Sequence, residues 1–238
     1  MSGADKDEVA GFYDDFVDYE LDSLRRPNRR LRRVHEHLEP LLAERQPQSA
    51  LDVGCGIGIT TAWIAERVPR VVGVDISPHT IETAARVHRA PEFRVAALPG
   101  DPLPEGPFDL ITFIDVLEHF PPDALRSAFT RIDEAIAPDG VLALNVPSKL
   151  FALRGESQQV IDEGVGVDEL TAAAAQLGME PLLVSRYGVE TANQYVFCAF
   201  ARSYDVSTPL PFARSDWVKN QLWLARLRLR SRRGDSNP

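Results

Sequence analysis

The chain has 238 residues, a formal net charge of −9 and 44% hydrophobic residues, which is typical of one globular domain with a sizeable core. The negative charge argues against a nucleic-acid binder that relies on bulk positive charge. The two cysteines, Cys55 and Cys198, exclude a disulfide scaffold, and no apolar run reaches the roughly 20 residues of a membrane span. The polar, acidic start is unlike a signal peptide, so we expect a cytoplasmic protein.

Residues 1–48 show helical patterns and are expected to form an N-terminal lid, with a helix over 29–45. An aromatic stripe within the first 20 residues is expected to pack on the domain; alternatively it closes the site, with Tyr13 or Tyr19 over the cofactor and Tyr13 facing the substrate. Residues 49–202 would form the core. Residues 203–238 would form a linker and a basic helix, which either lies on an anionic membrane, joins a second subunit or docks on its own domain.

Short apolar strands alternate with helices from residue 49 onward. Strands are expected at 49–53, 70–74, 93–97, 108–114 and 141–146, and the helix over 121–137 should stop before a Pro-Asp-Gly turn. A helix over 167–177 and an antiparallel hairpin over 181–187 and 194–201 follow. The pattern predicts a doubly wound α/β fold, with a mostly parallel sheet and an antiparallel edge.

A glycine-rich turn follows the first strand, with glycines at positions 54, 56 and 58 and Asp52 just before it. Such a turn at a helix start suits a ligand that lies against bare backbone. Polar residues also end the second and fourth strands, namely Asp75 and then Asp115, Glu118 and His119. Because ligands bind at the carboxyl edge of open α/β sheets, these residues indicate a binding site there.

Five motifs in order carry a family resemblance: Leu51-Asp52-Val53-Gly54-Cys55-Gly56-x-Gly58, Gly73-Val74-Asp75-Ile76-Ser77, Phe108-Asp109-Leu110-Ile111, Asp115-Val116-Leu117-Glu118-His119 and Ala137-Pro138-Asp139-Gly140. Over residues 50–148 the chain resembles a class I S-adenosylmethionine-dependent methyltransferase of the small-molecule type, similar to the ubiquinone-biosynthesis O-methyltransferases. The resemblance implies a seven-stranded, Rossmann-like sheet whose last strand is antiparallel, with S-adenosylmethionine as cofactor.

The resemblance also implies roles for single residues. The methionine part of the cofactor would be held by Asp52 and the backbone of Gly54, Cys55 and Gly56, with Asp115 lining that end. Asp75 would accept the ribose hydroxyls and Ile76 would pack on adenine. No acidic residue directly follows the third strand, so we expect the backbone of Ala97 and Leu98 to contact the adenine, with Asp101 reaching back as the alternative.

The expected reaction is methyl transfer to a small molecule, at oxygen rather than nitrogen. His119 would be the general base and Glu118 would orient it, facing the substrate; alternatively both contact the next helix or the N-terminal segment. No histidine follows His119, which argues against a metal site, and the other histidines are expected on the surface. Two other functions stay open: a Rossmann-type oxidoreductase, which prefers G-x-G-x-x-G, and a non-catalytic cofactor-binding interaction protein.

Overall fold

The computed structural model describes residues 28–149 and 165–202, together with residues 11, 17 and 21. The chain divides into two compact units, Met1–Tyr204 and Asp205–Pro238, and all described residues belong to the first. The expectations for Tyr13 and Tyr19, for the loop after residue 149 and for the basic C-terminal helix lie outside the described residues. Within the described part of the chain, no helix has both the length and the apolarity to cross a membrane.

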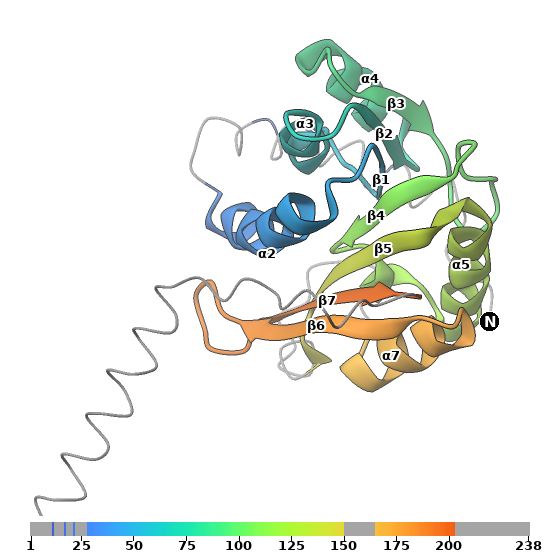
Figure 1. Ribbon diagram of the computed structural model, residues 1–238. Coiled ribbons are helices and arrows are strands. Elements are labelled where there is room, and N and C mark those ends of the chain that lie inside the picture. Colours follow the sequence, from blue (N-terminus) through green and yellow to red (C-terminus); the bar gives the residue numbers. More distant parts are fainter. Residues whose placement is uncertain (1–10, 12–16, 18–20, 22–27, 150–164, 203–238) are drawn as a thin grey trace, which may run out of the picture. The chain divides into compact units, whose positions relative to one another are not determined.

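One seven-stranded sheet forms the centre of the first unit (Figure 1). The strands are β1 (Ser49–Val53), β2 (Arg70–Asp75), β3 (Glu92–Val95), β4 (Phe108–Ile114), β5 (Ile136–Pro147), β6 (Glu180–Tyr187) and β7 (Tyr195–Ala201). Their order across the sheet is β3-β2-β1-β4-β5-β7-β6, in which β7 is antiparallel to both neighbours and all other pairs are parallel. The predicted fold class and the hairpin at the edge are confirmed.

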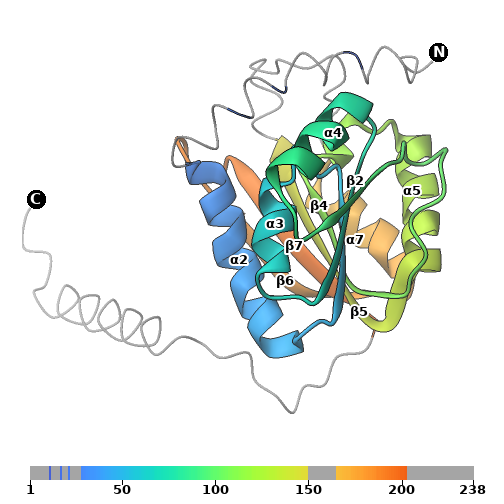
Figure 2. The same cartoon turned by 90° about the horizontal axis from the view of Figure 1, so that it is seen from above.

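Helices cover both faces of this sheet, and two apolar clusters fill the spaces between (Figure 2). Helices α2 (Arg29–Arg45) and α3 (Ile59–Ala65) contribute to one cluster, and α5 (Pro122–Ala135) and α7 (Val167–Gln176) contribute to the other. Helix α4 (Pro78–Val87) packs on β2 and β3, and the 3₁₀ turn η1 (Leu117–His119) follows β4. The parallel strands therefore all end at one edge of the sheet, where the predicted site residues lie.

Two helix starts follow from local sequence alone. The side chain of Asn28 accepts a hydrogen bond from the Leu31 amide at 3.0 Å and begins α2 at the expected residue. The Ser77 hydroxyl does the same for the Thr80 amide at 3.0 Å, and Pro78 occupies the first helical position of α4. In both helices the capping side chain contacts an amide only three residues away.

The start of β5 differs from the prediction. The strand begins at Ile136, so that the Pro-Asp-Gly segment lies within it rather than before it. Ile136 pairs with Phe108 on β4, and the register shifts between Phe108 and Leu110 before regular pairing resumes. The extra sheet pairing with β4 outweighs the turn preference of Pro138-Asp139-Gly140. Helix α3 ends at Ala65, and β3 ends at Val95, two residues before the predicted end at residue 97.

Candidate active site

The glycine turn between β1 and α3 is held tightly by its own chain. Gly54, Gly56 and Gly58 have φ values of +68°, +55° and +81°, which glycine adopts at little cost. The amide groups of Gly54 and Cys55 both donate to the Val74 carbonyl of β2, at 2.8 and 3.0 Å. The turn is therefore fixed against the end of β2.

Two of these glycines are also required by close packing within the protein. A Cβ atom on Gly54 would overlap the Val116 side chain that follows β4, and one on Gly58 would lie 2.6 Å from Cζ of Phe93. At these two positions the protein's own side chains occupy the space, rather than a ligand. Close packing against Val116 and Phe93 is therefore a second reason, besides the shape of the turn, for glycine at these positions.

Asp52 lies beneath the turn, with 2% of its surface exposed. The hydroxyl groups of Thr61 and Thr112 each donate to one of its carboxylate oxygens at 2.6 Å. Burial raises the pKa of Asp52 to about 6, against the lowering effect of the two hydroxyls, and the nearby charge of Asp75 raises it further. Asp52 is therefore a buried carboxylate that two hydroxyl donors hold directly beneath the turn.

Asp75 ends β2 beside the glycine turn and is also buried. Its carboxylate accepts hydrogen bonds from the Gly56 amide at 3.0 Å and from the Ser77 amide at 3.1 Å. Asp52 and Asp75 therefore place two buried carboxylates at one turn, and this pair favours a ligand that carries positive charge.

The loop after β3 adjoins the same edge, because the Ala96 amide donates to the Asp75 carbonyl at 2.9 Å. Asp101 reaches back in this loop, and its carboxylate accepts a hydrogen bond from the Ala97 amide at 2.9 Å. Ala97 is buried, whereas Ile76 and Leu98 are half-buried. The structure therefore brings Ile76, Ala97 and the Asp101 carboxylate to the β2–β3 side of the site.

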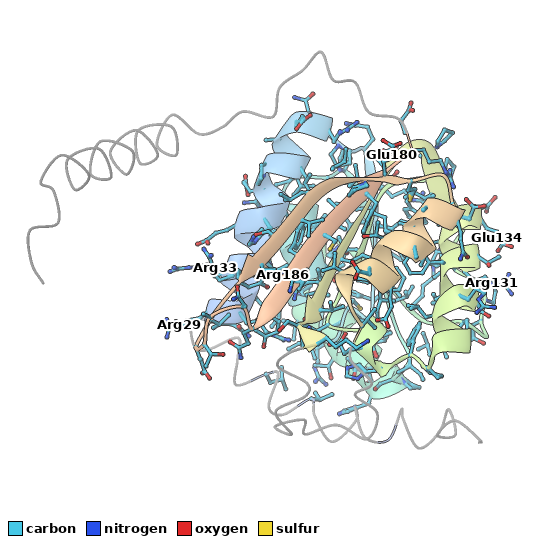
Figure 3. All side chains as sticks on the ribbon, turned by 90° about the horizontal axis from the view of Figure 1, so that it is seen from below. Arg29, Arg33, Arg131, Glu134, Glu180 and Arg186 are labelled. Atoms are coloured by element: carbon cyan, nitrogen blue, oxygen red, sulfur yellow. The ribbon has the colours of Figure 1, made fainter. Side chains whose placement is uncertain are left out.

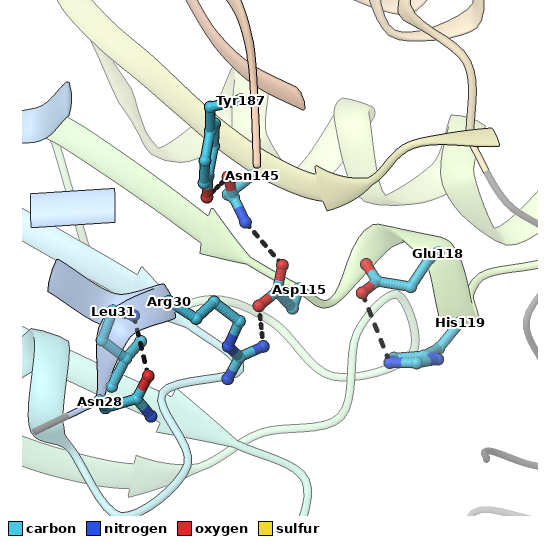
Figure 4. A network of polar contacts seen from close by, with 8 residues as sticks. All are labelled: Asn28, Arg30, Leu31, Asp115, Glu118, His119, Asn145 and Tyr187. Carbon is cyan, nitrogen blue, oxygen red and sulfur yellow. Dashed lines mark hydrogen bonds and ion pairs between the residues drawn. The ribbon is translucent and has the colours of Figure 1, made fainter. Parts of the chain in front are cut away.

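Asp115 follows β4 and lies at the centre of a network of polar contacts (Figure 4). Its oxygen Oδ1 accepts a hydrogen bond from Asn145 Nδ2 at 2.6 Å, and Oδ2 pairs with the Arg30 guanidinium of α2. The Tyr187 hydroxyl at the end of β6 donates to Asn145 Oδ1 at 2.7 Å. Side chains from α2 and β5 thus contact this carboxylate directly, and one from β6 is linked to it through Asn145.

Sequence reasoning missed three members of this network: Arg30, Asn145 and Tyr187. Arg30 is hidden among neighbouring arginines, and Tyr187 stands in an ordinary strand pattern. Asn145 did offer a signal, because it is the one polar residue of the apolar stretch 141–146, and the structure buries it fully. The charge of Asp115 raises the pKa of Arg30, while burial and then Asp115 raise the pKa of Tyr187.

Glu118 and His119 lie in η1, directly after Asp115. Their side chains point toward one another in Figure 4, with 3.9 Å between Glu118 Oε1 and His119 Nε2. That separation is longer than a hydrogen bond and suits an ion pair when His119 is protonated. Among the residues that the structure describes, no group of three His, Cys, Asp or Glu side chains could hold a metal ion.

Three of the histidines expected on the surface, namely His35, His37 and His88, are in fact half-buried. His35 stacks on Trp63, with ring centroids 4.2 Å apart, and contacts the Thr60 hydroxyl at 3.3 Å. His37 contacts the Ser185 hydroxyl at 2.9 Å. For His35 and His37 the expectation was wrong because α2 packs on both α3 and β6, which covers two of its faces rather than one; His88, after α4, lies beside Phe93 of β3.

Residues 22–170 of this chain match the model of a protein family described as a methyltransferase domain. This stretch contains the glycine turn, Asp75 and Asp115. The chain belongs to this methyltransferase family. The predicted resemblance to class I S-adenosylmethionine-dependent methyltransferases is thereby confirmed, and the oxidoreductase alternative is set aside.

Relatives of this methyltransferase domain include trans-aconitate 2-methyltransferase of Methylobacterium radiotolerans, which is 39% identical over 109 residues. That match covers 44% of this chain and 40% of the relative. The ubiquinone biosynthesis O-methyltransferase of Bordetella avium is 29% identical over 167 residues, or 61% of this chain and 68% of the relative. The chain thus spans well under half of the first relative and about two thirds of the second.

Solved structures share the fold of the methyltransferase domain. The magnesium protoporphyrin IX methyltransferase of Synechocystis, crystallised with bound SAH, superposes with a TM-score of 0.65 at 17% identity, covering 84% of this chain and 100% of that one. A TehB-like methyltransferase of Corynebacterium glutamicum gives 0.62 at 16% identity, covering 81% and 99%. At such identities the likeness concerns the fold alone.

Proposed function

We propose that this methyltransferase domain transfers a methyl group from S-adenosylmethionine to a small-molecule acceptor, at oxygen rather than nitrogen. The observation that carries the proposal is the meeting of the glycine turn, Asp75 and Asp115 at the carboxyl edge of β1, β2 and β4. This edge is where ligands bind in open α/β sheets. The names of the relatives include both O- and N-methyltransferases, so the preference for oxygen rests on His119.

The chain's residues fit the nucleoside half of this cofactor. Asp75 is a carboxylate at the end of β2, where it could accept both ribose hydroxyls. Ile76 offers an apolar surface to the adenine ring. Because the Ala97 amide already donates to Asp101, we place the Asp101 carboxylate, held by that bond, at the adenine amino group.

The residues also fit the amino-acid half of the cofactor, which carries an ammonium and a carboxylate. Asp115 and Arg30 are an anion and a cation side by side at the edge of the sheet. We therefore assign the ammonium to Asp115 and the carboxylate to Arg30, next to the backbone of Gly54, Cys55 and Gly56. The buried charge of Asp52 would favour the positive sulfur from beneath the turn.

When bound, S-adenosylmethionine supplies a methyl group on a positively charged sulfur that leaves readily. The protein has to hold the acceptor in line with that methyl group, and such positioning can lower a barrier by about 7–11 kcal/mol. His119 would accept the proton of an acceptor hydroxyl through its imidazole, a role worth about 10²–10⁴-fold in rate. Glu118, 3.9 Å from Nε2, would stabilise the imidazolium that forms.

The remaining parts of the proposal concern the outer segments of the chain. Residues 1–48 and the segment around 150–166 would surround the acceptor, with Tyr13 facing it. The basic C-terminal helix would either meet an anionic membrane or a second subunit, or dock on its own domain. Deletion of residues 203–238, followed by vesicle sedimentation and light scattering, separates these three roles.

Calorimetric titration with S-adenosylhomocysteine tests the proposal directly, and we expect binding in the micromolar range. No binding at high micromolar ligand would contradict the proposal. Methyl transfer is then followed with labelled S-adenosylmethionine and a panel of small phenols, carboxylic acids and amines. Transfer to amines alone would overturn the preference for oxygen.

The role of His119 is tested with the acceptor found in that panel. We expect His119→Ala to lower turnover by about 10²-fold or more while cofactor affinity changes little. His79→Ala, which removes an exposed imidazole from α4, is the matched control. Equal losses of turnover and cofactor affinity would instead give His119 a binding role.

A further inference from the structure

The hydrogen-bonded chain from Tyr187 through Asn145 to Asp115 links the β6–β7 hairpin to the proposed cofactor site. Tyr187 and Asn145 are 5% and 0% exposed, so water does not compete for their polar groups. Both side chains project toward Asp115 in Figure 4. Removing one of these hydrogen bonds would leave a buried polar group without a partner, which costs free energy of folding. The network ends at Asp115, so its effect on that residue indicates its role.

Asn145 fixes both the backbone and the side chain of Asp115. The backbone of Asp115 has φ +58°, a left-handed conformation that residues other than glycine adopt rarely. The Asp115 amide donates to the Asn145 carbonyl at 2.8 Å, while Asn145 Nδ2 donates to the Asp115 carboxylate at 2.6 Å. One residue on β5 thus holds the unusual backbone and sets the direction of the carboxylate.

Tyr187 in turn fixes the direction of the Asn145 amide. Its hydroxyl donates to Asn145 Oδ1 and leaves Nδ2, on the other side of the amide, to face Asp115. The pKa of Tyr187 is raised by burial, so the hydroxyl keeps the proton that it donates. Without this hydroxyl, either end of the Asn145 amide could face Asp115, and the amide oxygen would repel the carboxylate.

We propose that Asn145 and Tyr187 are positioning residues that aim the Asp115 carboxylate at the ammonium of the cofactor's amino-acid part. The inference rests on the proposed function and deepens it, because it assigns the hairpin a share in cofactor recognition. It predicts that the network matters for ligands with an amino-acid group and not for the nucleoside alone. That difference separates a positioning role from a merely structural one.

The test compares two probes, S-adenosylhomocysteine and 5′-methylthioadenosine, which share the nucleoside and the thioether but differ in the amino-acid part. The wild-type protein should bind S-adenosylhomocysteine more tightly. In Tyr187→Phe, we expect the ratio of the two dissociation constants to shrink by about tenfold, because a hydrogen bond to a charged group is lost or misdirected. Tyr195→Phe is the matched control, since Tyr195 stacks on Tyr187 at 5.6 Å and, among the described residues, is not part of the hydrogen-bonded chain. Its ratio should equal that of the wild-type protein.

Each outcome has one meaning. If the ratio of the two dissociation constants in Tyr187→Phe equals that of the wild-type protein, whether or not both probes bind more weakly, the positioning role is overturned and the proposed function stays intact. If the wild-type protein binds neither probe, the proposed function fails. Should Tyr187→Phe not fold, a crystal structure of the wild-type complex with S-adenosylhomocysteine decides. The inference requires the ligand ammonium on Asp115 while Asn145 still donates to the other oxygen, and an ammonium placed elsewhere overturns it.

Discussion

Thr112 lies directly opposite Asp52 in the pairing of β4 with β1, and its hydroxyl donates to Asp52 Oδ1 at 2.6 Å. The sheet register therefore places the hydrogen-bond donor that a buried carboxylate needs. Thr61 supplies the second donor from α3. Even with both hydroxyls, burial keeps the pKa of Asp52 raised, which means that the ionised form is costly in the folded protein.

Asp52→Asn should stabilise the protein near pH 8 and weaken its binding of S-adenosylmethionine. The pKa of Asp52 rises from 3.8 to about 6 on folding, so its contribution to stability is present below pH 4 and lost as the pH rises through 6. The variant's free energy of unfolding should exceed that of the wild-type protein by about 1–3 kcal/mol at pH 8 and match it near pH 4. Urea unfolding at both pH values measures this. A difference independent of pH would contradict the explanation.

Asp75→Asn should lower the affinity for S-adenosylhomocysteine by about 10- to 100-fold, because the amide replaces an ionised acceptor for the ribose hydroxyls. The matched control is Asp109→Asn at the opposite end of β4. The Asp109 carboxylate also accepts two backbone amides, from Gln48 at 2.8 Å and Ser49 at 3.0 Å. In the control, calorimetry should find a less stable folded protein, because the Asp109 contacts are weakened, but an unchanged affinity for S-adenosylhomocysteine. Similar losses of affinity in both variants would argue against a ribose contact at Asp75.

Patterns within a few residues predicted most of the fold, because caps, turns and strand periodicity act over short distances. The bounds of β1 and β4 are examples. The polar network could not be predicted, because Arg30 and Asp115 are 85 residues apart and Asn145 and Tyr187 are 42 apart. Those contacts depend on the strand order and on how α2 crosses the sheet, which no local pattern contains.

The packing of α2 predicts how stability depends on pH. His35 stacks on Trp63, and burial, followed by the charge of Arg67, lowers its pKa from 6.5 to about 4. A depressed pKa in the folded state contributes stability above pH 6.5 that is lost as the pH falls toward 4. His35→Phe keeps the stack and cannot be protonated, so it should lose less stability than the wild-type protein over that range. Urea unfolding at pH 7 and pH 4.5 measures the difference, with exposed His79→Phe as control. Parallel curves for His35→Phe and the wild-type protein would exclude this role.

Gly54→Ala should destabilise the protein for two separable reasons. The residue has φ +68°, which costs an alanine roughly 1–2 kcal/mol, and its Cβ would overlap Val116, which adds about 1–3 kcal/mol of overpacking. Gly178 provides a control with the same φ of +68° but no atom within 4 Å of an added Cβ. Gly178→Ala should therefore carry only the smaller, conformational cost.

Val116→Ala removes the two Cγ atoms that the new Cβ would approach most closely, at 2.3 and 3.1 Å, and leaves the Val116 Cβ at 3.3 Å. Combined with Gly54→Ala it should restore part of the lost free energy of unfolding, so that the two substitutions are less than additive. Combined with Gly178→Ala it should be additive, since those sites share no contact. If Gly54→Ala and Gly178→Ala prove equally destabilising, close packing against Val116 does not explain the glycine. A non-additive pair would show that the turn and the end of β4 are held together at this contact, which fixes the turn beside Asp115.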